Sequence, residues 1–342
     1  MSKPVRTAVT GCGLQGNVHL NSLNQIDTAE LVAICEPQPD RLEKAGETFG
    51  VTDLYTDFNE MLESTRPELV TLATPVVFHA RQAVAAFDAG AHVLCEKPLA
   101  MNVDEAEQMF EAAKRNGKKL GMGLQNRYRT EAVYLKEFID RGELGRIFHG
   151  RSYCGHKMNI PGYGQLHRND MSGGGVMFAT AVHSLDLVIW LMGNPEPVRV
   201  SAQSYQRIHQ MQNPPITWDG PLEDFDVEDF ISAIVHFDNG ASLDIISDWL
   251  HHDYNCSGLE LFGDYGMATY NPLRITLDDG ASFKEIKPEI ENEGDFQGIV
   301  ADLVRCIQED ETPRYRFSEM RNVQRIMNAA YRSIEEGREV EA

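Results

Sequence analysis

Short apolar runs alternate with longer segments of helical periodicity through the first 125 residues. The run Glu68–Ala73 is almost continuously apolar, as expected of a strand buried on both faces of a parallel sheet. Further strands are expected at residues 5–10, 30–35, 54–55, 92–95 and 119–124, and helices at residues 15–26, 40–49, 58–64, 78–89 and 104–116. This alternation predicts a doubly wound α/β domain of the Rossmann type over residues 1–125.

The pattern changes beyond Gln125, where we place a domain boundary. A helix is expected at residues 130–141, and alternating segments predict strands near residues 147–153, 198–205, 229–237, 241–247 and 258–262. Asp238-Asn239-Gly240 is a strong hairpin signal between two of them. Residues 126–342 are therefore expected to form an α+β domain, an antiparallel sheet with a few helices on one face. We expect self-association to cover the other face.

A glycine-spaced turn joins the first strand to the first helix. Gly11 permits the tight turn, Gly13 lets the backbone approach a pyrophosphate, and Gly16 lets the helix pack on the strand. The phosphates would lie at the positive end of the helix. Glu36 ends the second strand close to the offset, about 20 residues, at which a carboxylate binds the ribose 2′-hydroxyl and repels a 2′-phosphate. The turn predicts a dinucleotide, with NAD favoured over NADP.

Composition narrows the classes of function. The formal net charge is -21, from 31 Lys and Arg against 52 Asp and Glu, without a basic cluster, which argues against nucleic acid and anionic membranes as partners. The six cysteines form no CxxC motif, which is typical of a reducing cytoplasm. No signal-like segment follows Met1 and no run of about 18 apolar residues occurs. We expect a soluble cytoplasmic protein of two domains.

Lys97 and His183 are the candidate acid/base groups. Lys97 follows the strand at 92–95, at the carboxyl end where ligands bind in open α/β sheets. Residues 172–193 predict a helix opened by glycines, on which His183 and Asp186 share one face. A histidine in an apolar helix is more often a core residue than a catalytic one. The presence of Lys97 as a second candidate group favours the catalytic interpretation of His183. An alcohol gives up hydride only as its hydroxyl proton is removed, so a nicotinamide enzyme without metal needs such groups.

Other motifs do not predict chemistry. His251-His252-Asp253 lacks further suitably spaced ligands, so no metal is expected. The acids of the loop at 206–228 lack the EF-hand spacing and are interpreted as solvated. The sequence contains no GxSxG elbow, P-loop or HExxH motif, which removes the common hydrolase and NTPase mechanisms.

Several motifs in order resemble the glucose-fructose oxidoreductase / inositol dehydrogenase / MocA (Gfo/Idh/MocA) family, nearly from end to end. The resemblance implies a Rossmann domain and a second domain with a large, mostly antiparallel open sheet, often used for homodimers and homotetramers. It implies NAD(P)-dependent oxidation or reduction of a secondary hydroxyl of a sugar, cyclitol or related compound. The motifs are Gly-Cys-Gly-Leu-Gln-Gly at 11–16, Glu36, Thr74-Pro75 with His79, Cys95-Glu96-Lys97-Pro98, Gln125 with Arg127, Gly173-Gly174-Gly175 with His183 and Asp186, and Val227-Glu228-Asp229.

The resemblance also implies roles for single residues. Lys97 and His183 would be catalytic. The residues expected to face the cofactor are Gly11, Gly13, Leu14, Gln15, Gly16, Glu36, Thr74, Pro75, His79 and Glu96. Those expected on the substrate side are Lys97, Gln125, Arg127, His156, Tyr163, Thr180 and His183.

Ala179 departs from the family pattern, because many members carry an aspartate four residues before the histidine. Thr180, Asp186 or Tyr163 could serve instead, Lys97 and His183 could suffice, or the protein could be a weak or non-classical member. Two alternatives to a sugar dehydrogenase stay open at this point. One is an enzyme that keeps NAD bound and uses transient oxidation for elimination or glycoside cleavage, and the other is a dinucleotide-binding sensor without catalysis.

Overall fold

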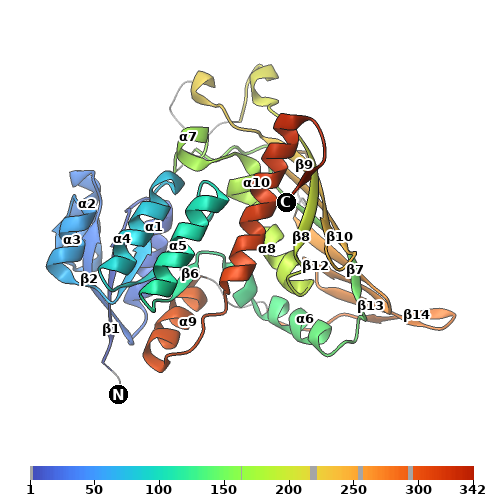
Figure 1. Ribbon diagram of the computed structural model, residues 1–342, viewed down its shortest axis with the longest axis horizontal. Coiled ribbons are helices and arrows are strands. Elements are labelled where there is room, and N and C mark those ends of the chain that lie inside the picture. Colours follow the sequence, from blue (N-terminus) through green and yellow to red (C-terminus); the bar gives the residue numbers. More distant parts are fainter. Residues whose placement is uncertain (1–2, 163, 216–221, 253–256, 292–295) are drawn as a thin grey trace. The chain divides into compact units, whose positions relative to one another are not determined.

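The computed structural model describes residues 3–162, 164–215, 222–252, 257–291 and 296–342 (Figure 1). The chain divides into two compact units. The first consists of residues 1–125, 163–165 and 295–320, and the second of residues 126–162, 166–294 and 321–342. The sequence placed everything after residue 125 in the second domain, so the return of 295–320 to the first unit differs from that expectation.

The first unit is built on a six-stranded parallel sheet in the order β3-β2-β1-β4-β5-β6. The order reverses between β1 and β4, and ligands bind outside the carboxyl ends of strands at such a switch point. All four residues of β4 are buried, as the apolar run predicted. The strands are β1 (Val5–Thr10), β2 (Ala29–Cys35), β3 (Leu54–Tyr55), β4 (Leu69–Leu72), β5 (His92–Cys95) and β6 (Leu120–Met122).

The helices of this unit begin and end at local signals in the sequence. Asp57 and Asn102 each accept a hydrogen bond from the backbone N–H three residues on and so cap the helices that follow. Gly50 ends a helix in the left-handed conformation. The helices are α1 (Leu14–Asn24), α2 (Pro39–Phe49), α3 (Phe58–Thr65), the 3-10 turn η1 (Val76–Phe78), α4 (His79–Asp88), α5 (Val103–Arg115) and α9 (Phe296–Glu309).

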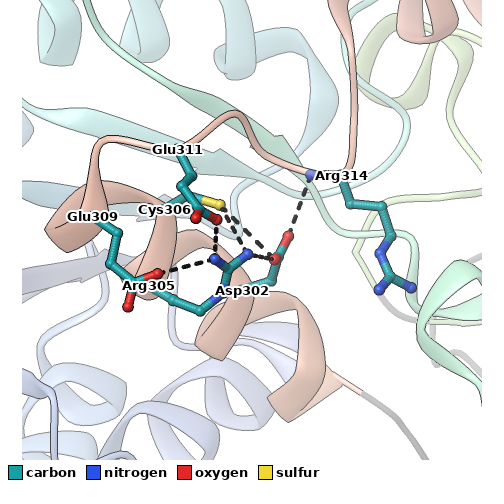
Figure 2. A network of polar contacts seen from close by, with 6 residues as sticks. All are labelled: Asp302, Arg305, Cys306, Glu309, Glu311 and Arg314. Carbon is teal, nitrogen blue, oxygen red and sulfur yellow. Dashed lines mark hydrogen bonds and ion pairs between the residues drawn. The ribbon is translucent and has the colours of Figure 1, made fainter.

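Helix α9 explains why the late segment belongs to the first unit. Its buried residues Ile299, Val300 and Leu303 lie on the side that packs against α1, β1, β5 and β6. Gly121 in β6 leaves room for Leu303, whose methyl carbon would lie 3.1 Å from an added Cβ. At the helix end Arg305 binds the carboxylates of Asp302, Glu309 and Glu311 (Figure 2). These exposed ion pairs order the turn after α9, while the apolar face supplies the packing energy.

The second unit contains a nine-stranded sheet in the order β14-β13-β12-β11-β7-β10-β9-β8-β15. Among the strand pairs of the described residues in this sheet, β7 and β10 run parallel and the others antiparallel. The hairpin between β9 and β10 confirms the Asp238-Asn239-Gly240 signal, and Gly240 adopts φ +80° there. The strands are β7 (Ile147–Lys157), β8 (Pro197–Tyr205), β9 (Phe230–Phe237), β10 (Ser242–His251), β11 (Gly258–Gly263), β12 (Gly266–Tyr270), β13 (Arg274–Asp279), β14 (Ser282–Ile286) and β15 (Val340–Glu341).

The helices α8 and α10 lie on one face of this sheet in Figure 1. Helix α8 packs on β7 and β11, where Gly150 would meet Met192 and Val188 if it carried a Cβ. A mostly antiparallel sheet with helices on one face confirms the expected fold class. The remaining elements are η2 (Gln125–Tyr128), α6 (Thr130–Asp140), α7 (Asn169–Ser172), the π-helix η3 (Met177–Ala181), α8 (Val182–Leu191), η4 (Ile208–Gln210), η5 (Leu222–Asp224) and α10 (Phe317–Glu336).

The segment Asn169–Leu191 is long and apolar enough, by length and composition alone, to cross a membrane. It is nevertheless a core segment, because 83% of its apolar window is buried inside the protein. It is also interrupted: Gly173 ends α7 at φ +78°, and a π-helical turn precedes α8. The sequence predicted a helix opened by the glycines, and η3 with α8 follows them as expected, while the π-helical turn at its start and the short helix α7 before the glycines were not predicted.

Candidate active site

The glycine turn between β1 and α1 requires glycine at two positions for steric reasons. Gly11 has φ +90°, and a Cβ there would lie 2.4 Å from the carbonyl oxygen of Ala73. A Cβ on Gly16 would lie 1.8 Å from the carbonyl oxygen of Gly11. A Cβ on Gly13, in contrast, would meet no atom within 4 Å. The space in front of Gly13 is therefore open toward the start of α1.

The residues at the start of α1 fit a dinucleotide. Helix α1 follows its N-cap residue Gly13 without a side-chain cap and without an acidic residue in its first turn, so no side chain of its own occupies its positive end. The side-chain oxygen of Gln15 is buried and has no hydrogen-bond partner among the described residues. Exposed Leu14 adds an apolar side chain beside this turn. An anionic pyrophosphate would complement this helix end.

Glu36 is fixed at the carboxyl end of β2. Its Oε2 accepts a hydrogen bond from the backbone N–H of Cys12 at 2.7 Å, and its Oε1 accepts one from Gln38 at 3.1 Å. The carboxylate is buried and so joins the end of β2 to the glycine turn. Each carboxylate oxygen can accept more than one hydrogen bond, so these contacts leave capacity for a ribose hydroxyl.

The loop after β4 is held by two residues of α4. The imidazole of His79 lies with Nε2 2.8 Å from the carbonyl oxygen of Thr74 and Nδ1 3.0 Å from that of Pro98. The hydroxyl of Thr74 donates to Gln82 at 2.6 Å. Burial lowers the pKa of His79, and its backbone hydrogen bonds oppose this effect. Both ring nitrogens of His79 thus lie near backbone carbonyl oxygens, and the cofactor-facing position implied for this residue stays a prediction.

Lys97 lies directly after β5, beside the buried carboxylate of Glu96. Oε1 of Glu96 is 2.6 Å from Nε2 of His19 on α1, and Oε2 accepts a hydrogen bond from the backbone N–H of Lys97 at 3.2 Å. Gly123 makes room for Glu96, since an added Cβ would lie 2.7 Å from Oε1. Glu96 therefore supports the turn of Lys97 from within the protein, and Lys97 itself is half-buried.

In the second unit, Glu228 organises the glycine segment that leads into the His183 helix. Its two oxygens accept hydrogen bonds from the backbone N–H groups of Gly175 and Met177, each at 2.9 Å, and the hydroxyl of Tyr331 donates to Oε1 at 2.7 Å. Burial raises the pKa of Glu228, and these hydrogen bonds oppose that rise. A Cβ on Gly174 would lie 2.1 Å from the Tyr331 oxygen, which explains why glycine is required there.

The π-helical turn contains both Ala179 and Thr180. The indole N–H of Trp249 donates to Oγ1 of Thr180 at 2.7 Å, and Nε2 of His156 lies 3.5 Å from the same oxygen. The structure thus brings together two of the residues expected on the substrate side, His156 and Thr180. π-Helical turns of this kind are frequent at functional sites.

His183, on α8, lines a pocket of about 270 Å³ within the second unit. Tyr153, Tyr270, Arg129 and Asn126 are among its polar lining residues. The side-chain amide of Asn126 donates to the carbonyl oxygen of His183 at 3.2 Å and so ties η2 to α8. A larger hollow of about 330 Å³ beside α1 and Gln297 belongs to the first unit and includes neither Lys97 nor His183.

Arg127 is fully buried and forms a two-point ion pair with Asp186. Its Nε lies 2.9 Å from Oδ2 and its Nη2 2.6 Å from Oδ1, and both side chains are 0% exposed. The guanidinium also lies over the Trp190 ring, 5.6 Å from the centroid. Arg127 therefore supports α8 from within the second unit, through Asp186. The expected places of Arg127 on the substrate side and of Asp186 beside His183 stay predictions.

Two family models match most of the chain. The model described as an oxidoreductase family with an NAD-binding Rossmann fold matches residues 5–124, and the one described as the Gfo/Idh/MocA C-terminal domain matches residues 132–269. This chain belongs to the Gfo/Idh/MocA family. The prediction of an NAD(P)-dependent oxidoreductase is confirmed by that membership.

The relatives of this Gfo/Idh/MocA protein include enzymes named for sugars and a cyclitol. D-glucoside 3-dehydrogenase of Escherichia coli K12 is 26% identical over 349 residues, covering 99% of this chain and 98% of that protein. Inositol 2-dehydrogenase of Salmonella typhimurium LT2 is 30% identical over 193 residues, covering 55% of this chain and 54% of that enzyme. The solved structure of levoglucosan dehydrogenase in complex with NADH and levoglucosan shares the fold, with a TM-score of 0.84 at 22% identity over 99% of both chains.

Sequence reasoning missed several residues that hold the site of this Gfo/Idh/MocA enzyme. His19, Tyr331 and Trp249 gave no signal in the sequence, because their partners Glu96, Glu228 and Thr180 lie far away along the chain.

The side-chain oxygen of Gln125, expected near substrate, is buried without a hydrogen-bond partner in the described ranges. Tyr163 and Asp253 lie outside the described residues. Within those residues no three His, Cys, Asp or Glu side chains gather as a metal site.

Proposed function

We propose that this chain is an NAD-dependent dehydrogenase of a secondary hydroxyl of a sugar, cyclitol or sugar derivative, with Lys97 and His183 as its acid/base groups. The observation that carries the proposal is the position of Lys97 at the carboxyl end of β5, on the turn that Glu96 and His19 connect to the dinucleotide helix α1. The names of the glucoside and inositol relatives support the substrate class.

When bound, NAD supplies the hydride acceptor. The glycine turn and the start of α1 would hold the pyrophosphate, and Glu36 the adenosine ribose. The amine of Lys97 removes the proton of the substrate hydroxyl, so that the carbon–oxygen double bond can form as hydride departs. His183 assists by hydrogen bonding to the same oxygen and moving the proton onward. In the reverse direction the two groups return the proton to the carbonyl oxygen.

A panel of sugars, cyclitols and sugar acids with NAD and NADP tests the function. We expect at least one member to give reduced nicotinamide, measured by its absorbance, with one equivalent formed per ketone product. A product formed without net NADH would instead support transient oxidation for elimination or glycoside cleavage. The absence of any turnover across the panel, with bound NAD demonstrated by calorimetry, would contradict the proposal.

The cofactor preference is predicted to depend on Glu36. The wild-type protein is expected to favour NAD because the buried carboxylate repels a 2′-phosphate. Glu36→Ser is expected to lower the ratio of kcat/KM for NAD over NADP by about tenfold, equivalent to about 1.4 kcal/mol. Steady-state kinetics with both cofactors measure the ratio, and Asp53→Ser, at an exposed acid in the same unit, is the control. An unchanged ratio in Glu36→Ser would remove Glu36 from the ribose site.

The open face of the nine-stranded sheet supports a homodimer or homotetramer. Tyr205, Ile234 and Ile246 point away from the face that carries α8 and are 56%, 47% and 43% exposed. Exposed apolar side chains that share one sheet face are typical of an interface between copies. We propose that this face mediates self-association.

A further inference from the structure

Two buried histidines converge on the turn Glu96–Pro98, which carries Lys97. We propose that His19 and His79 are positioning residues that fix Lys97 for proton transfer, His19 through the side chain of Glu96 and His79 through the backbone of Pro98. The proposal rests on the function proposed above, because it concerns the amine assigned there as the acid/base group.

His19 connects the dinucleotide helix with the turn. It lies on α1, within two turns of Gly13, and its Nε2 is 2.6 Å from Oε1 of Glu96 with both side chains buried. The other oxygen of Glu96 accepts the backbone N–H of Lys97. The chain of contacts therefore runs from α1 through one carboxylate to the backbone of Lys97. A shift of α1 would be transmitted to that backbone.

His79 connects the same turn with the loop after β4. Its ring is 1% exposed and lies between the carbonyl oxygens of Pro98 and Thr74. A neutral imidazole has one N–H and can donate to only one of these two oxygens at a time. Because the ring contacts Thr74 after β4 and Pro98 after β5, it joins the carboxyl ends of these two neighbouring strands. The ends of β4 and β5 flank the expected ligand crevice.

If these contacts served packing alone, burying their polar groups would lower the stability of the fold. A buried histidine and carboxylate lose hydration, and an apolar pair of similar volume is often as stable or more so. The pair His19–Glu96 and the contact of the buried His79 ring with the Pro98 carbonyl both meet on residues 96–98, and Gly123 leaves the space that Glu96 occupies. A misplacement of a catalytic group by about 1 Å can lower the rate of the chemical step by about 100-fold. We therefore infer that these contacts serve to position Lys97 rather than to stabilise the fold.

The geometry allows a test with isosteric variants. The side-chain nitrogen of glutamine reproduces Nε2 of histidine, and that of asparagine reproduces Nδ1. His19→Gln thus keeps the hydrogen bond to Glu96, whereas His19→Asn loses it. His79→Asn keeps the contact to Pro98 beside Lys97, whereas His79→Gln keeps only the contact to Thr74.

We expect His19→Gln and His79→Asn to retain more activity than their counterparts. His19→Asn and His79→Gln should lower kcat by about 10- to 100-fold, with the dissociation constant of NAD from calorimetry unchanged. His92→Gln is the matched control, since His92 lies at the opposite end of β5 and accepts a hydrogen bond from Lys119 N–H. Equal kcat within each pair, or the reverse order, would overturn the proposal.

A second readout separates this proposal from the proposed function. The rate of acetylation of the Lys97 amine by an activated ester, followed by mass spectrometry of its peptide with the other lysine peptides as internal standards, needs no turnover. We expect His19→Asn and His79→Gln to change that rate for Lys97 alone. If the panel finds no substrate but the Lys97 rate changes, the function fails and the positioning role stands. If the acetylation rate of Lys97 in all variants equals that of the wild type, the positioning role fails. This holds whether or not the variants remain active.

Discussion

Lys97→Ala is expected to lower kcat by about 10²- to 10⁴-fold, the usual contribution of a positioned acid/base group. The amine is the only titratable side chain that the Glu96–Pro98 turn presents beyond the buried Glu96, so its loss removes the proton acceptor from this strand end. Binding of NAD should persist, because the glycine turn, the start of α1 and Glu36 are separate from that amine.

The measurement combines turnover with the substrate found in the panel and calorimetric titration with NAD. Lys114→Ala is the control, because it removes the same charge from an exposed position on α5 in the same unit. Full activity of Lys97→Ala, or a loss explained entirely by weaker NAD binding, would refute the assignment of Lys97.

The fold of the first unit could be predicted because its signals are local. The apolar run at β4, the glycines between β1 and α1, and the strand end before Lys97 are each visible within about ten residues, and the doubly wound order follows from their alternation. The placement of α9 could not be predicted in this way. Its apolar face is clear in the sequence, but which sheet that face packs against depends on contacts across about 180 residues or more.

The second unit was predicted in type but not in detail, for a related reason. The hairpin at Gly240 is a local signal, whereas the strands β12, β13 and β14 are short and were not anticipated. The helix expected after the glycines of 172–193 is present, but its first turn is π-helical, and Glu228 and Tyr331 hold the glycine segment that precedes it. A helical wheel drawn through Ala179 therefore misplaces that residue relative to His183.

The buried pair of Arg127 and Asp186 shows the same limit at the site itself. Sequence spacing puts Asp186 on the face of His183, and the family resemblance puts Arg127 near substrate, but neither pattern predicts that the two side chains form a fully buried pair. An arginine without exposure needs a carboxylate with matching geometry, since an uncompensated buried charge is strongly unfavourable. Only the tertiary contact between η2 and α8 reveals that each satisfies the other.

Asp186→Ala is expected to lower the free energy of unfolding of the second unit by about 3–5 kcal/mol, because it leaves the Arg127 guanidinium buried without its counter-charge. Chemical denaturation followed by near-UV circular dichroism measures the loss. The double variant Arg127→Met with Asp186→Leu is the control, and it should recover most of that stability, since well-packed apolar residues often replace a buried ion pair without loss. Activity should fall in Asp186→Ala even where the protein is folded, because α8 also carries His183. If the free energy of unfolding fell by less than about 1 kcal/mol, the effect would be that of an exposed ion pair. Such a result would contradict the prediction and show that water reaches Arg127.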